Sequence, residues 1–185
     1  QNTFLNYIKC IRAYQWVKNI LVFVPMLAAH QITTQNFTNS FLAFIAFCLI
    51  ASSVYIVNDL FDLNADRAHP QKRLRPFASG AIPIKNGLII FLLLFVMGTT
   101  LSFFVNFYFF ISILIYYMLT FMYSIILKKK VILDICILGI LYTLRIIAGG
   151  FATEVQISFW LLAFSIFLFL SLAAVKRQSE LVDLK

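Results

Sequence analysis

Charged side chains are scarce in this sequence. Asp, Glu, Lys and Arg make up 12% of its 185 residues, whereas about a quarter of an average soluble domain is charged. Apolar residues make up 62%, and phenylalanine alone occurs 21 times, which is more apolar surface than a water-facing fold of this length can hide. The composition excludes an ordinary soluble domain. It indicates that the partner of most of the surface is the lipid bilayer, and we expect no nucleic-acid partner.

Cysteine is also rare. Cys10, Cys48 and Cys136 lie far apart in apolar or near-apolar stretches. Their spacing matches neither a disulfide framework nor a metal motif. We therefore interpret all three as packing residues.

Two long stretches, residues 19–58 and 86–127, contain no Asp, Glu, Lys or Arg. A membrane-spanning helix needs about 20 apolar residues at about 1.5 Å of rise each, so each stretch holds two helices. The polar breaks are residues 30–36 and Asn106, and a third hairpin turns between Gly149 and Gln156. Backbone groups in hydrocarbon must be bonded internally, which favours helices. We predict an all-α polytopic transmembrane helical bundle, a single domain whose six spans cover roughly residues 17–33, 38–58, 86–105, 107–127, 131–150 and 157–175.

Positive charge lies on one side of this predicted arrangement. Lys and Arg occur before the first span, in the loops 59–85 and 128–130, and after the sixth span, while the loops on the other side contain none. By the positive-inside rule, both ends of the chain and the charged loops face the cytoplasm. We expect a multi-pass protein of the cytoplasmic (inner) membrane.

Three acids follow the second predicted span. Asp59, Asp62 and Asp66 are spaced i, i+3 and i+7, which predicts one helical face that Asn58 borders. Like charges this close repel one another unless a cation joins them. Mg²⁺ prefers such oxygen ligands and bridges carboxylates to substrate phosphates. We predict a magnesium site with Asp59, Asp62 and Asp66 as metal ligands, and these three acids together with Asn58 as catalytic residues; the alternative is a solvated helix end with ordinary charge.

A basic segment comes directly after the acids. Lys72, Arg73 and Arg75 stand between Pro70 and Pro76, and a stiff cationic segment suits phosphate oxygens. Taken alone, the segment is equally typical of a cytoplasmic topology signal or a lipid-headgroup patch. Beside the acids, it predicts the second half of one pocket for an anionic substrate.

The motif Asn-Asp-x-x-Asp-x-x-x-Asp at residues 58–66 resembles the first aspartate motif of the UbiA superfamily of intramembrane prenyltransferases. The decaprenyl-phosphate phosphoribosyltransferase branch, also called decaprenylphosphoryl-5-phosphoribose synthase, is the more specific resemblance. It rests on four segments in the expected order, at residues 15–19, 66–76, 141–150 and 176–181.

The resemblance implies a magnesium-dependent membrane transferase that moves a phosphoribosyl group from phosphoribosyl pyrophosphate to polyprenyl phosphate and releases pyrophosphate. It implies a fold of nine spans, so we expect this chain to be incomplete at its C-terminal end. Glu180 stands where many relatives carry a second aspartate motif and is a further candidate metal ligand. The residues expected to bind substrate or phosphate are Lys18, Arg67, Lys72, Arg73, Arg75, Tyr123, Lys128, Lys176 and Arg177.

Two other functions compete with this one. A UbiA-type aromatic prenyltransferase would use a polyprenyl diphosphate as its donor. That donor has no 5-phosphate, so it would not explain the extra cations of the basic segment. A carrier for a phosphorylated solute is less favoured, because the acids lie at one membrane edge rather than midway. The isoprenoid chain length and a homo-oligomeric state stay open.

Arg145 lies deep in the fifth predicted span. A charge at that depth is costly and needs a partner or a function. We expect a structural pairing with backbone carbonyls near Gly149 and Gly150.

Overall fold

The computed structural model describes residues 3–125 and 131–182, and in these ranges every regular element is a helix. Five helices are long and apolar enough to cross a membrane, which confirms the all-α polytopic bundle. They are α3 (Thr34–Phe61), α5 (Ile84–Val105), α6 (Phe107–Ile125), α7 (Val131–Thr153) and α8 (Phe159–Val182).

The first predicted span has a different form from the other five. After the amphipathic helix α1 (Thr3–Ile11), the chain forms the 3-10 helix η1 (Ala13–Phe23) and then the short α-helix α2 (Val24–Ala28). The expectation of one α-helix over residues 17–33 was therefore wrong. A 3-10 helix rises about 2 Å per residue and an α-helix about 1.5 Å, so η1 and α2 together measure about 30 Å, close to the hydrocarbon thickness of a bilayer.

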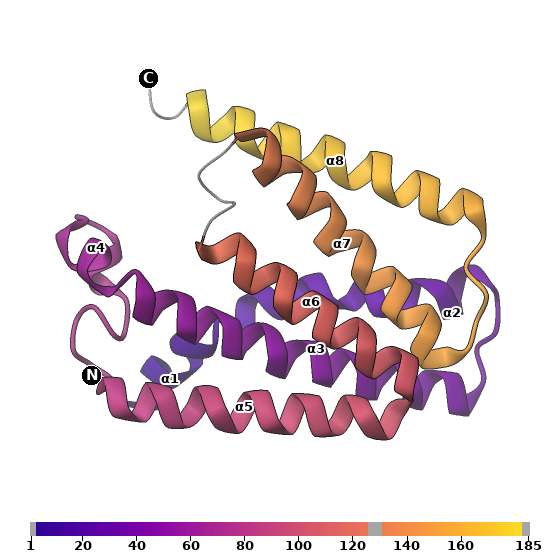
Figure 1. Ribbon diagram of the computed structural model, residues 1–185, viewed down its shortest axis with the longest axis horizontal. Coiled ribbons are helices and arrows are strands. Elements are labelled where there is room, and N and C mark those ends of the chain that lie inside the picture. Colours follow the sequence, from indigo (N-terminus) through magenta and orange to yellow (C-terminus); the bar gives the residue numbers. More distant parts are fainter. Residues whose placement is uncertain (1–2, 126–130, 183–185) are drawn as a thin grey trace.

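The helices run between two ends of the bundle. One end holds α1, α4 (Leu63–Ala68), η2 (Lys72–Leu74) and the C-terminal end of α8, and the other end holds the turns that follow α2, α5 and α7 (Figure 1). The third of these turns lies at residues 154–158, because α7 continues through Gly149 and Gly150 to Thr153. The predicted acidic and basic segments thus lie together at one end.

Helix α3 occupies the centre of the bundle. Its Phe47 packs edge-on against Phe109 and Tyr116 of α6, with ring centroids 5.9 and 5.1 Å away, an arrangement that aromatic pairs favour. Small residues let neighbouring helices approach closely, as at Gly98 of α5, where an added Cβ would lie 2.8 Å from the Ile50 side chain. Helices α5 and α8 keep many large apolar side chains exposed, as expected of surfaces that face lipid.

Helix α3 ends within the acidic motif, so the three acids do not share one helix. It stops at Phe61, Asp62 leaves helical geometry with ψ at 5°, and Asp66 belongs to the separate helix α4. Asp and Asn side chains compete with the backbone for hydrogen bonds and favour such helix ends, and this segment contains Asp62 and Asn64. The expectation of one continuous helical face for all three acids was therefore wrong.

Candidate functional site

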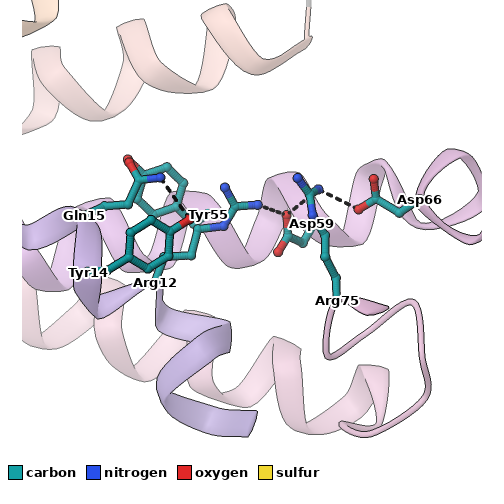
Figure 2. A network of polar contacts seen from close by, with 7 residues as sticks. All are labelled: Arg12, Tyr14, Gln15, Tyr55, Asp59, Asp66 and Arg75. Carbon is teal, nitrogen blue, oxygen red and sulfur yellow. Dashed lines mark hydrogen bonds and ion pairs between the residues drawn. The ribbon is translucent and has the colours of Figure 1, made fainter. Parts of the chain in front are cut away.

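Two buried carboxylates and two arginines form a network at the end of α3. Asp59 Oδ1 accepts hydrogen bonds from Arg12 Nη2 at 2.5 Å and from Arg75 Nη1 at 3.2 Å. The same Arg75 nitrogen donates to Asp66 Oδ2 at 2.7 Å. Figure 2 shows Arg12 and Arg75 approaching Asp59 from two sides, with Arg75 also reaching Asp66.

The two arginines come from irregular backbone. Arg12 joins α1 to η1 in the left-handed conformation, with φ at 51° and ψ at 47°, which costs a non-glycine residue about 1–2 kcal/mol. Its guanidinium lies over the Tyr55 ring, 5.1 Å from the centroid. Arg75 follows η2 in extended geometry. The ion pairs and the ring contact offset the unfavourable backbone of Arg12 and bring both side chains to the acids.

Burial makes the network dependent on all of its members. Asp59 and Asp66 are each only 3% exposed. A buried carboxylate that loses its cationic partner becomes an uncompensated charge, which is strongly destabilising. Cys10 lies close to this network and is fully buried. Burial raises the pKa of its thiol to about 12, the Asp59 carboxylate adds to the rise, and Arg12 opposes it.

The predicted basic segment does not act as one unit. Arg75 points inward to the acids, whereas Lys72, Arg73 and Arg67 are exposed, and Asp62 is half-buried at the helix break. Among the side chains that the structure describes, no three His, Cys, Asp or Glu residues form a ready-made metal cluster. The protein side chains that converge are the pair Asp59 and Asp66.

A cavity of about 260 Å³ adjoins the network. Four cations line it, Arg12, Lys18, Arg145 and Lys176, and none of the described residues that line it is acidic. Arg12 belongs to both places, since it also bonds Asp59. Among the predicted site residues, Asn58 and Tyr123 line the cavity as well. Lys18 donates to Gln15 Oε1 at 2.7 Å.

Arg145 lies in the wall of this cavity and is 5% exposed. Its Nε donates to Asn19 Oδ1 at 2.9 Å, its Nη1 to the Leu141 carbonyl at 2.6 Å, and its Nη2 to Tyr116 Oη at 2.8 Å. It also lies 4.9 and 5.4 Å from the ring centroids of Tyr116 and Tyr142, within cation–π range. The expected pairing with a backbone carbonyl occurs, but at Leu141 rather than near Gly149 and Gly150.

The remaining predicted residues lie at the same end of the bundle or outside the described part. Tyr123 Oη donates to Asp134 Oδ1, which ties the end of α6 to the start of α7. Arg177 is half-buried and follows Lys176 on α8. Lys128 and the side chain of Glu180 lie outside the described residues.

Several residues of the site were not anticipated from the sequence. No binding role was assigned from the sequence to Arg12, Asn19, Tyr116 or Tyr142, although Asn19 and Tyr142 lie in segments that carry the family resemblance. Arg145 could be recognised from the sequence as a charge deep in an apolar helix. Its side-chain hydrogen-bond partners could not, because they come from η1 and α6, far away in the sequence. For Arg12 only its closeness to the first span could have drawn attention.

The donor set at the acids fits a magnesium ion. Asp59 and Asp66 supply hard oxygen atoms, and both already converge on one positively charged group, Nη1 of Arg75. Mg²⁺ in proteins is commonly held by one or two carboxylates together with substrate phosphates rather than by an all-protein cage. A pair of carboxylates with cations beside it is such a set.

Comparison with known proteins gives consistent results. A model of the UbiA prenyltransferase family matches residues 19–184. Nodulation protein NoeC of Azorhizobium caulinodans is 36% identical over 98% of this chain, and decaprenyl-phosphate phosphoribosyltransferase of Mycolicibacterium smegmatis is 37% identical over 98% of it. The chain spans 59% and 58% of the lengths of these two relatives.

A solved structure shares the fold. It is that of a UbiA homolog from Archaeoglobus fulgidus bound to GPP and Mg²⁺. The TM-score is 0.76 at 18% identity, and the match covers 90% of this chain and 60% of that one.

Proposed function

The chain belongs to the UbiA prenyltransferase family, and we propose that it is a membrane transferase that moves a phosphoribosyl group from phosphoribosyl pyrophosphate to polyprenyl phosphate. Pyrophosphate is the second product. Its likeness to a decaprenyl-phosphate phosphoribosyltransferase supports this choice of substrates. Its comparable likeness to a nodulation protein makes the donor the point that an assay must decide.

The observation that carries the proposal is the pairing of two different anion sites. Asp59 and Asp66 converge on Arg75, and a cation-lined cavity adjoins them through Arg12. A carboxylate pair suits a metal-bound diphosphate, whereas a cation-lined cavity suits a phosphate without a metal. A reaction between a diphosphate donor and a phosphate acceptor needs both.

The chemistry needs little from the protein beyond charge and placement. Asp59 and Asp66, with Asp62 beside them and Glu180 as a further candidate, would hold Mg²⁺, which when bound neutralises charge on the diphosphate leaving group. An oxygen of the lipid phosphate bonds to C1 of the ribose, while the C1–oxygen bond breaks and its electron pair leaves with pyrophosphate. The attacking oxygen is already anionic, so no protein base is required.

The arginines and lysines of the site have separate tasks in this proposal. Arg12 pairs with Asp59, and Arg75 pairs with both Asp59 and Asp66. Both arginines would also supply positive charge to the donor. The exposed cations Arg67, Lys72 and Arg73 raise the local concentration of anions at the cytoplasmic end. Lys128 and Arg177 stand near the ends of α6 and α8 in the sequence and would add to that field.

Donor preference tests the proposal. Membranes that contain the protein are supplied with ribose-labelled phosphoribosyl pyrophosphate and polyprenyl phosphate, or with labelled polyprenyl diphosphate and an aromatic acid acceptor. We expect ribose label in a phosphoribosyl lipid in the first case, above the level of membranes that lack the protein, and no labelled prenylated aromatic product in the second. Consumption of the polyprenyl diphosphate with no use of the ribose donor would instead identify an aromatic prenyltransferase.

A further inference from the structure

We infer that the cavity lined by Arg12, Lys18, Arg145 and Lys176 binds the phosphate group of the lipid acceptor, and that Arg145 is its deepest contact. This inference rests on the proposed function. It adds a specificity-determining residue, Arg145, and separates the two substrates between two neighbouring sites.

The charges of the cavity call for an anion. Its four cations come from η1, α7, α8 and the junction before η1, and no acid occurs among its described lining residues. Arg12, Arg145 and Lys176 all lie close enough to Lys18 to repel its ammonium group. Asp59 already compensates Arg12, but no described acid lines the cavity beside Lys18 and Arg145, and like charges this close are unfavourable unless an anion joins them.

Arg145 has hydrogen-bonding capacity left for such an anion. A guanidinium carries five N–H groups, and Arg145 makes three hydrogen bonds, to Asn19, Leu141 and Tyr116. It forms no ion pair with any acid whose side chain the structure describes. The three bonds and two tyrosine rings fix the planar group in place, so that its remaining N–H groups at the cavity can bind phosphate without further ordering.

Depth and lining favour a lipid-bound phosphate over the soluble donor. Arg145 stands three turns beyond Asp134 on α7, about 16 Å along the helix axis, and Tyr116 and Tyr142 beside it also line the cavity. A mixed wall of cations and aromatic rings suits a phosphate that carries an isoprenoid chain. With no carboxylate among its described lining residues, the cavity lacks the ligands that usually hold the Mg²⁺ of a bound diphosphate.

The position of the cavity also suits the reaction. Arg12 lines it and at the same time bonds Asp59. A phosphate in the cavity therefore lies next to the acids that would hold the donor. The acceptor oxygen and the ribose carbon can meet only if the two sites adjoin in this way.

Binding of farnesyl phosphate, a short polyprenyl monophosphate, tests the inference directly. The purified protein in nanodiscs is titrated with farnesyl phosphate in the presence of EDTA, so that no metal can help. We expect Arg145→Gln to weaken binding about tenfold to hundredfold, the usual effect of losing a charge-assisted hydrogen bond. Arg145→Lys should restore only part of it, because a point charge does not replace the planar fork.

Matched controls separate this role from a structural one. Lys176 is exposed on α8, so Lys176→Gln should weaken farnesyl phosphate binding without affecting the fold. This variant therefore keeps the test valid if Arg145→Gln does not fold. Lys85→Gln removes an exposed cation outside the cavity and should leave binding unchanged. Binding of farnesol, which lacks the phosphate, should not respond to any of these variants.

Binding of the donor, measured in the same variants, is the second part of the test. Binding of phosphoribosyl pyrophosphate with Mg²⁺ should change less than about twofold in Lys176→Gln and Arg145→Gln. The inference is overturned if farnesyl phosphate binds only with Mg²⁺, if both variants bind it normally, or if they weaken the donor instead. Arg145-dependent binding of farnesyl phosphate without any transfer from the ribose donor would leave the inference standing and overturn the proposed function.

Discussion

At the residue scale, Arg75 links the two buried acids of the site. One of its nitrogens donates to both Asp59 and Asp66, so the spacing of the two carboxylates depends on this side chain. It is also the innermost cation of the basic segment, since Lys72 and Arg73 are exposed. Arg75 is therefore placed to respond both to the acids and to an incoming phosphate.

Replacing Arg75 should weaken donor binding and also lower the stability of the protein, because the buried Asp66 loses its cation. We expect Arg75→Ala to lower the affinity for phosphoribosyl pyrophosphate about tenfold to hundredfold, equivalent to about 1.5–3 kcal/mol, through the loss of charge-assisted bonds. Arg75→Lys should recover part of the loss. Arg73→Ala, at an exposed side chain of the same segment, should have the smaller effect. Equal effects of Arg73→Ala and Arg75→Ala in a direct binding titration would contradict the inward role of Arg75.

Cys10 should be protected from thiol reagents in the folded protein. Its pKa is raised from an ordinary value of 9.0 to about 12, so the reactive thiolate is almost absent at pH 8. Maleimide should label it only after unfolding in detergent, whereas a cysteine placed at the exposed Ser79 should react at once. Rapid labelling of native Cys10 at pH 8 would show that the thiol is not buried.

The same shift predicts a pH dependence of stability. The folded thiol keeps its proton up to a higher pH than the unfolded one, so its contribution to stability is complete below about pH 9. This contribution is lost as the pH rises from about 9 to about 12. Cys10→Ala should remove this part of the alkaline destabilisation.

The sequence pointed to the residue types of the site but not to their pairing. Acids at the edge of an apolar span can be recognised in the sequence, because charged residues are rare elsewhere in it. The inward turn of Arg75 and the left-handed backbone of Arg12 depend on contacts between α1, α3 and the loop after α4. Such long-range contacts leave no periodic signal in the chain.

At the element scale, the packing of η1 on α7 holds the cavity wall together. Gly149 is the closest approach, since a Cβ added there would lie 2.1 Å from the Val22 carbonyl oxygen. Backbone atoms cannot move aside as the end of a side chain can. Any residue larger than glycine must therefore push η1 away from α7, and with it Asn19 away from Arg145.

Gly149→Ala should destabilise the protein more than Gly139→Ala. Overpacking of this kind costs about 1–3 kcal/mol, and at Gly149 the obstacle is backbone. At Gly139 of the same helix the nearest atom is the end of the Leu170 side chain at 2.9 Å, which can rotate. Thermal unfolding in detergent measures the difference, and a larger effect at Gly139 would contradict the close contact between η1 and α7.

Hydropathy predicted the positions of five helices well because each is apolar and separated by polar or charged breaks. It could not predict that the first segment forms a 3-10 helix, since apolar composition is the same for either helix type. The end of α3 at Phe61 was missed for a similar reason. The i, i+3, i+7 pattern of the acids assumed a regular helix where Asp and Asn favour an end.

At the scale of the whole molecule, the proposed function requires one orientation in the membrane. Cysteines introduced at one end of the bundle, at the exposed Thr34, which begins α3, and at the exposed Gln156, in the turn after α7, should react with an impermeant maleimide on intact cells. Cysteines at Asn64 and Ser79, exposed at the other end, should react only after the membrane is opened. Labelling of Asn64→Cys from outside would place the acids on the wrong side for a cytoplasmic donor.

The two ends of the bundle differ in function in this account. The end that holds α1, α4 and η2 brings together Asp59, Asp66, Arg75 and the cation-lined cavity, whereas the turns after α2, α5 and α7 lie at the other end. The site is therefore a property of the assembled bundle, since its side chains come from the junction before η1, from η1, α3, α4, α6, α7 and α8, and from the loop after α4.

The most direct measurement is the magnesium dependence of phosphoribosyl transfer in the wild type and in Asp59→Asn and Asp66→Asn. Each substitution keeps the shape of the side chain and removes its charge. We predict that both lower the rate of label transfer from phosphoribosyl pyrophosphate to polyprenyl phosphate by about a hundredfold or more, while the protein stays inserted and Asn64→Ala, on the exposed face of α4, behaves as the wild type. Near-normal, magnesium-dependent transfer by both variants would contradict the account, because the buried acids would then be a structural feature only.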